Sequence, residues 1–285
     1  MATLVSGDLT SVQQEKILSV VQKELARKTF MLPLTRNYSS LLGKGNTQVN
    51  VPRWGSFDGG ITDHTEDSLI PTSKLSKDTD IITPSEYRAL SFAITDLSNA
   101  ESFVSLLPTY TDRMTTAMAR DLDTKAYEAA YAGVNVANQL PDSVGGDRIS
   151  KDDILEMRKT LIKQNADGQY WCVISPDTEA ELLNIDNFID ASKYGSSEFI
   201  QKGEIGKIYG VRFIVNNVVP STATTDQHLM FTADHLGWVH QLKPKFESKR
   251  EPEYQRTRYV MAHRFGFGSL QDGVLAVSKA VDTTA

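Results

Sequence analysis

The most informative stretch of this sequence is Phe199–Pro220, which reads FIQKGEIGKIYGVRFIVNNVVP. Three glycines, Gly203, Gly206 and Gly210, come at short intervals before an apolar run rich in β-branched residues. Glycine lets the backbone turn through positive φ at no steric cost, and β-branched residues favour a buried strand. The stretch contains no pattern typical of a nucleophile, a metal site or a phosphate-binding loop. We therefore predict a structural turn at the glycines and a strand that ends near Pro220.

Composition indicates a globular protein with enough length for a substantial core. Of the 285 residues, 40% are hydrophobic and 23% are charged, values that argue against a disordered chain. The net charge of −6 argues against general nucleic-acid binding, which needs clustered Lys and Arg. The single cysteine, Cys172, is interpreted as a buried structural thiol. No signal peptide or membrane span is expected from the pattern of apolar residues.

The N-terminal part combines one helix with a long polar excursion. Apolar residues at helical spacing predict a helix over Ser11–Lys28, and Pro33 lies beyond its end. Residues Lys44 to Thr83 lack that spacing and predict two short strands, Val49–Pro52 and Leu75–Ile82, joined by acidic and turn-forming residues. A hairpin of this kind cannot build a core of its own. Either a substrate or a neighbouring subunit must cover it.

The middle of the chain predicts a strand followed by a long helix. Glu86–Thr95 has strand character, and Ser98 or Asn99 is the expected cap of the helix that follows. Apolar residues spaced by threes and fours then predict a helix over Pro108–Ala132. Proline near its beginning indicates a kink or a restart there.

Helices and strands alternate in the next part, which predicts a compact α/β unit. Ser150 and Asp153 form a capping-box variant at the start of a helix, Tyr170–Ser175 reads as a buried strand, and Pro176 begins another helix. Closer to the C-terminus, Tyr254–Phe265 predicts a long strand, and we expect Gly273–Val277 to pair back on it.

Catalytic and metal-binding patterns do not occur in the sequence in a convincing form. His235 and His240 are five residues apart, which on a strand places their rings on opposite faces and not around one metal ion. Asp121 and Asp123, two apart on a helix, point away from each other and read as separate acids. We expect no catalytic residues, no metal site and no cofactor.

The glycine stretch resembles a signature of the major capsid proteins of tailed bacteriophages, which have the Hong Kong 97-type fold. The sequence ISP before a helix, upstream of the glycines, is similar to the same family's pattern. The order of predicted segments matches the family over nearly the whole chain. The resemblance implies an α+β fold with an N-terminal arm, an extended β-hairpin loop, a peripheral domain with a long spine helix, and an axial α/β domain. It implies five parts: an N-terminal arm and short helix (1–43), the extended loop (44–84), the peripheral domain with the spine helix (85–133), the axial domain (134–240) and closing strands of the peripheral domain (241–285).

Family membership implies a structural role: pentamers and hexamers that assemble into an icosahedral shell around double-stranded DNA, with arm and loop wrapped onto neighbouring subunits. Expected partners are other copies of the chain, a portal, a separate scaffolding protein, possible decoration or cement proteins, and packaged DNA without sequence-specific contact, but no membrane. The expected location is the virion capsid, with assembly in the host cytoplasm.

Two groups of residues are candidates for contacts between subunits, because opposite charges across an interface fix its register. Singly, the basic residues read as an ordinary mixed-charge surface; together they could receive the acidic hairpin. The candidates in the hairpin are Trp54, Phe57, Asp63, Glu66, Asp67 and Lys74, and those in the basic patch are Lys243, Lys245, Lys249 and Arg250.

Two other interpretations remain open at the level of sequence. A bacterial encapsulin shares this fold and would enclose an enzyme in place of DNA. A soluble α+β enzyme could use residues 44–83 as a lid over a site that contains His235 or His240.

Overall fold

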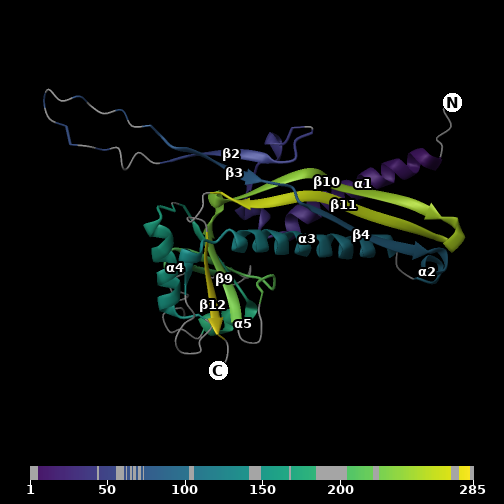
Figure 1. Cartoon of the computed structure of the whole chain (residues 1–285). Helices are drawn as coiled ribbons and strands as arrows, with labels where there is room; N and C mark the ends of the chain where they lie inside the picture. Colours follow the sequence, from purple (N-terminus) through teal and green to yellow (C-terminus); the bar gives the residue numbers. More distant parts are fainter. Residues whose placement is uncertain are drawn as a thin grey trace.

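The computed structural model describes residues 6–43, 45–55, 61, 63–64, 66, 69, 72, 74–102, 106–140, 149–166, 168–183, 204–220, 225–270 and 276–282. They form a long limb of strands and helices, an α/β unit beside one end of that limb, and a two-stranded ribbon that leaves the body at the same end (Figure 1). The tip of the β10–β11 hairpin lies at the opposite end of the limb (Figure 1).

A four-stranded sheet forms the limb. In spatial order its strands are β1 (Arg36–Asn37), β10 (Leu236–Glu251), β11 (Arg256–Ser269) and β4 (Glu86–Thr95). The long β10–β11 hairpin is antiparallel and shifts register between His240 and Lys245. Pro244 lies within this irregular stretch, where the missing backbone N–H is tolerated because the ladder is already interrupted.

A six-stranded mixed sheet forms the α/β unit. In spatial order its strands are β5 (Gln139–Leu140), β12 (Ala276–Asp282), β9 (Thr225–Thr232), β6 (Tyr170–Ile174), β8 (Val211–Val215) and β7 (Glu204–Ile208). The expectation that the last strand pairs back on Tyr254–Phe265 is wrong: β12 pairs antiparallel with β9 and parallel with β5. The sequence after Ser269 therefore returns to the α/β unit.

The helices are α1 (Ser6–Lys28), α2 (Asp96–Glu101), α3 (Leu106–Ala132), α4 (Lys151–Lys163) and α5 (Pro176–Leu183), with short 3-10 turns η1 (Leu32–Leu34), η2 (Ser39–Leu41), η4 (Val136–Asn138), η6 (Ala233–His235) and η7 (Pro252–Tyr254). The capping box of Ser150 and Asp153 at the start of α4 is confirmed. The cap expected for α2 is wrong, because Thr95 occupies that position and its hydroxyl accepts from the Ser98 N–H at 3.2 Å. Pro108 lies in the first turn of α3, where its missing N–H disturbs no helical hydrogen bond.

Helix α3 packs against both sheets and so joins the limb to the α/β unit. Its first half places Met114 and Met118 in a cluster with Met261 of β11. Its second half places Ala126 and Tyr127 in another cluster with strands of the six-stranded sheet. The Tyr127 hydroxyl donates to the Gln227 carbonyl oxygen at 2.6 Å, and burial raises the pKa of this phenol far above its usual value.

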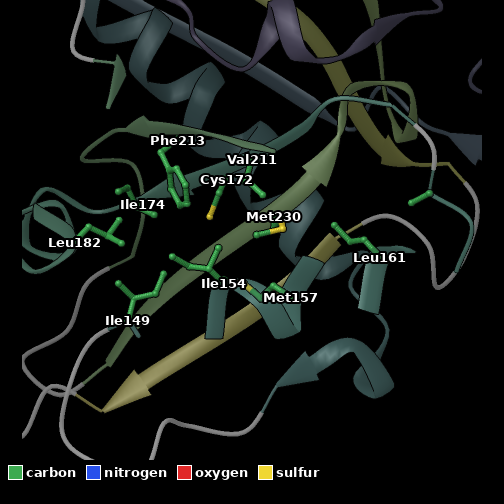
Figure 2. Packing of buried hydrophobic residues seen from close by; sticks show 11 residues of the cluster. Ile149, Ile154, Met157, Leu161, Cys172, Ile174, Leu182, Val211, Phe213 and Met230 are labelled. Carbon is green, nitrogen blue, oxygen red and sulfur yellow. The ribbon is translucent and has the colours of Figure 1, made fainter. Parts of the chain in front are cut away.

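The α/β unit has its own core on the side of its sheet that α4 covers. Side chains of α4, among them Ile154 and Met157, meet Met230 of β9, Cys172 of β6 and Phe213 of β8 (Figure 2). The thiol of Cys172 is fully buried, and desolvation raises its pKa to about 12. This confirms a structural cysteine, since a reactive thiol needs exposure and a lowered pKa.

The chain crosses the limb sheet at glycine residues of β11. A Cβ atom at Gly266 would come within 2.1 Å of the Thr83 carbonyl oxygen, so any larger residue would push away the β3–β4 connection. Glycine is required here because two backbones approach closely. Strands β2 (Val49–Trp54) and β3 (Lys77–Ile82) form the ribbon. At this crossing the base of the ribbon packs against β10, with Val49, Ile82 and Val239 in one buried cluster.

The carboxylate of Asp123 holds the segment after α1 on α3. Its two oxygens accept from the backbone N–H groups of Phe30 and Met31, at 3.1 and 3.0 Å. Burial raises the pKa of Asp123 to about 6, although these two hydrogen bonds act in the opposite direction. Nearby, the ammonium of Lys28 donates to Asp112 at 2.5 Å and to Thr116 at 2.9 Å.

We predict that Asp123→Ala lowers the free energy of unfolding by about 1–3 kcal/mol, because the buried N–H of Met31 and the half-buried N–H of Phe30 lose their acceptor. The matched control is Asp112→Ala, which breaks an exposed ion pair worth about 0–1 kcal/mol. Urea denaturation at pH 7 of the unassembled protein measures both. Equal losses in the two variants would contradict the role of Asp123.

Candidate functional site

The glycine stretch forms a tight hairpin between β7 and β8. Tyr209 and Gly210 connect the strands with φ of 49° and 82°. Two successive residues with positive φ are typical of the turns whose twist matches a β-hairpin. Gly206 lies within β7, at a register shift between Glu204 and Lys207; Gly203 lies outside the described residues. The predicted turn is present at Gly210, whereas Gly206, which the sequence also assigns to the turn, lies within strand β7.

The β2–β3 ribbon is a two-stranded antiparallel structure, with Val49 opposite Ile82 and Trp54 opposite Lys77. Arg53 pairs with Asp78 at 2.5 Å and with Asp80 at 3.7 Å across the ribbon. Trp54 is 61% exposed, and the Lys77 ammonium lies over its ring, 5.5 Å from the centroid. Cross-strand charge and ring contacts keep the ribbon together where no core supports it.

The connection between β2 and β3 carries the other hairpin candidates. Asp63, Glu66 and Lys74 are all exposed, whereas Phe57 and Asp67 lie outside the described residues. Two large apolar side chains that we did not single out are also exposed, Ile61 at 82% and Leu69 at 94%. Singly exposed apolar side chains are common on protein surfaces, so Ile61 and Leu69 gain weight only together with the ribbon, which has no core of its own.

Ion pairs within the chain neutralise part of the basic patch on β10. Lys245 pairs with Glu247, and Arg250 makes a two-pronged contact with the carboxylate of Asp96. These contacts raise the pKa values of Lys245 and Arg250 and lower that of Asp96. Lys243 and Lys249 have no ion pair among the described residues. The described residues thus form a mixed-charge surface in which part of the positive charge is already paired.

Among the described residues, the ribbon and the far end of the basic patch lie apart from each other. The ribbon leaves one end of the limb, while Lys249 and Arg250 lie near the β10–β11 tip at the other end (Figure 1). A contact between the ribbon and Lys249 or Arg250 would therefore need a second copy of the protein.

The two histidines singled out from the sequence have different surroundings. His235 is buried, and its Nδ1 is hydrogen-bonded to the hydroxyl of Thr232. The ring of His240 packs instead against that of His263 on β11, with centroids 5.7 Å apart. Within the described part of the chain, no three His, Cys, Asp or Glu side chains group together as a metal site would require.

The His240–His263 pair is a buried polar feature that sequence reasoning missed. Nε2 of His240 and both ring nitrogens of His263 are buried without a hydrogen-bond partner among the described residues. Desolvation lowers both pKa values to about 4; His263 and Lys243 add to the effect on His240, and Arg88 to that on His263. Both rings are neutral at pH 7 and unsuited to acid–base work there.

Comparison with known proteins identifies the chain. Residues 78–277 match the sequence profile of a family described as phage capsid protein. The chain belongs to this family. The match extends from β3 into β12 and includes α3 and the hairpin with Gly210. This capsid protein is therefore a structural component of the virion shell, and its identification as a major capsid protein of a tailed phage is confirmed. The comparison with curated proteins finds no match.

Solved structures of phage capsids share its fold. The capsid of cyanophage P-SCSP1u has a TM-score of 0.69 at 15% identity and covers 89% of this chain and 88% of that chain. The capsid of cyanophage Pam1 has a TM-score of 0.69 at 12% identity, and the match covers 91% of this chain and 93% of that chain. A structure from Mycobacterium phage Che8 has a TM-score of 0.67 at 18% identity, and the match covers 90% of this chain and 92% of that chain. These likenesses confirm the predicted α+β capsid fold. No helix in the described part of the capsid protein is long and apolar enough to cross a membrane.

Gly210→Val should destabilise the protein by about 1–2 kcal/mol or more, because a β-branched residue at positive φ is strained. Gly210→Asn is the matched control and should cost less, since asparagine tolerates this conformation. Thermal unfolding of both variants measures the difference. Equal stability of the valine variant and the unmodified protein would show that the turn does not depend on glycine.

We predict that the histidine pair destabilises the protein in acid. Since the folded pKa values of about 4 lie below the ordinary 6.5, the unfolded chain takes up protons first, and stability falls as pH drops from about 6.5 to 4. The raised pKa of Asp123 acts with the opposite sign between about 6 and 4.

His263→Phe keeps a ring in place and removes one of the two titrating groups. The difference in unfolding free energy between this variant and the unmodified protein should therefore shift in favour of the variant as pH falls, while the contribution of Asp123 cancels. His64→Gln, in the exposed connection, is the control. A pH profile of His263→Phe parallel to that of the unmodified protein would contradict the prediction.

Proposed function

We propose that this capsid protein assembles as pentamers and hexamers into an icosahedral shell that encloses double-stranded DNA. The observation that carries the proposal is the β2–β3 ribbon, which leaves the body and has no core of its own. Two strands alone are marginally stable in water, so the ribbon needs a further surface. A neighbouring copy supplies one in a closed ring of subunits.

Wrapping is the proposed mechanism of shell stability. The end of β2 and the connection to β3 would place the exposed side chains of Trp54, Ile61 and Leu69 against the next subunit. Apolar area that one chain leaves in water would then be buried collectively, at roughly 25 cal/mol per Å². We also propose that the N-terminal arm before Val21 takes part in these contacts.

Opposite charges would set how the loop of one copy aligns on the surface of its neighbour. The acids Asp63, Glu66 and Asp67 of one copy would face the basic patch of its neighbour, where Lys243 and Lys249 lack ion pairs among the described residues. Exposed charge pairs contribute little affinity but exclude wrong orientations.

Further partners follow from the proposed shell. We propose a portal, a separate scaffolding protein and, in some settings, a decoration protein, with assembly in the host cytoplasm before the protein enters the virion. The net charge of −6 suits a container that holds DNA without adhering to it. The five-part division remains part of the proposal, with β12 assigned to the α/β unit.

Replacing residues 59–67 by a short turn should leave folded subunits that fail to close shells. The change removes the loop that would contact the neighbouring subunit and leaves the hydrophobic core intact. The matched change at the N-terminus is deletion of residues 1–15. Deletion of everything before Phe30 would remove Val21 and Leu25, which pack against α3, and so damage folding too. Electron microscopy of gel-filtration fractions, with nuclease-protected DNA as a second readout, measures the outcome.

Normal shells from both variants would rule out wrapping. Shells of the unmodified protein that protect an enzyme in place of DNA would instead support an encapsulin.

A further inference from the structure

The outer edge of strand β4 has unused hydrogen-bonding capacity. β4 is the last strand of the four-stranded sheet, and only β11 pairs with it in the described part of the chain. That pairing runs without a register shift from Glu86–Phe265 to Thr95–Arg256. Every second residue of such a strand directs its backbone N–H and C=O outward, so ten regular residues form a ready template for another strand.

Other edges of the protein carry protective features that β4 lacks. Strand β2 contains Pro52, strand β3 carries Asp78 and Asp80, and β1 is only two residues long. Proline, charge and shortness each prevent strand addition. β4 reads EYRALSFAIT, with no proline and with both charges near its start.

Exposed side chains lie along the same edge. Tyr87 is 63% exposed and Leu90, at the middle of the strand, 38%. Ala89, Ser91 and Ala93 are also exposed and lie on one face of the sheet, since residues two apart share a face. These small side chains leave room for a second sheet to continue in the same plane.

We propose that β4 pairs antiparallel with β4 of a second copy, about a two-fold axis at Ser91, so that two four-stranded sheets become one continuous sheet. The inference rests on the proposed function in one respect: copies of the protein must come into contact with each other. A two-fold contact cannot be the one that closes a ring of five or six, because that contact is head-to-tail. Strand pairing would therefore link neighbouring rings.

Self-pairing fits the sequence of the strand. With Ser91 opposite itself, Leu90 faces Phe92 of the second copy, and Tyr87 faces Thr95 of the second copy. Aromatic residues opposite aliphatic or β-branched residues are favourable cross-strand pairs. Arg88 then lies opposite Ile94, and Glu86 remains outside the paired stretch. No like charges oppose each other, which makes a second copy the fitting occupant of this edge.

The test is disulfide cross-linking of the full-length Ser91→Cys protein during assembly. Ser91 would lie directly opposite its mate at about 5 Å, within disulfide range. Val260→Cys is the matched control: Val260 pairs with Ser91 on β11, and its mate would be three strand spacings away, about 14 Å. The native Cys172 is buried and gives no background. Adding Leu90→Glu to the Ser91→Cys protein places two carboxylates near the axis and should lower the cross-linked fraction several-fold.

We expect covalent dimers from Ser91→Cys in a fraction at least several-fold larger than from Val260→Cys. Electron microscopy of the same samples separates the two hypotheses. Shells without selective cross-linking would overturn the strand pairing and leave the proposed function standing. Selective dimers without shells would support the pairing and count against the proposed function. Neither shells nor selective dimers would overturn both.

Discussion

The packing of α3 against two different sheets is the constraint on which the rest of the structure depends. Met114 and Met118 pack toward the limb, while Ala126 and Tyr127 pack toward the six-stranded sheet. A helix of 27 residues is about 40 Å long at 1.5 Å per residue, so one rigid element spans both units. Each sheet is thereby held at a fixed place along the same axis.

Buried polar groups complete this arrangement where apolar packing cannot. The Asp123 carboxylate holds the turn after α1, and the Tyr127 hydroxyl holds β9. At the start of α5, the hydroxyls of Ser175 and Thr178 donate to the Asp226 carboxylate at 2.8 and 3.0 Å. Such bonds stabilise modestly but are costly to leave unmade. These hydrogen bonds therefore specify the position of each element and add little to the total stability.

Sequence reasoning recovered the elements better than their connections. Helical spacing was enough to place α3, and the capping box was enough to begin α4, because both signals are local. The pairing of β12 with β9, by contrast, joins residues far apart in the chain, and no local pattern encodes it. The same holds at the candidate surfaces: the ion-pair partner of Arg250 is Asp96, 154 residues earlier in the chain. The His240–His263 pair was missed because strand register decides which rings meet.

The position of β12 has a consequence for how the protein is made. Residues 276–282 are inserted between β5 and β9, in the interior of the six-stranded sheet. Domains synthesised from the N-terminus fold as units once their parts are present. This unit lacks an interior strand until residues 276–282 have been synthesised. The sheet of the α/β unit is therefore completed only after every other described element has been made, so a nascent chain that has not reached β12 cannot have the final form that a growing shell requires.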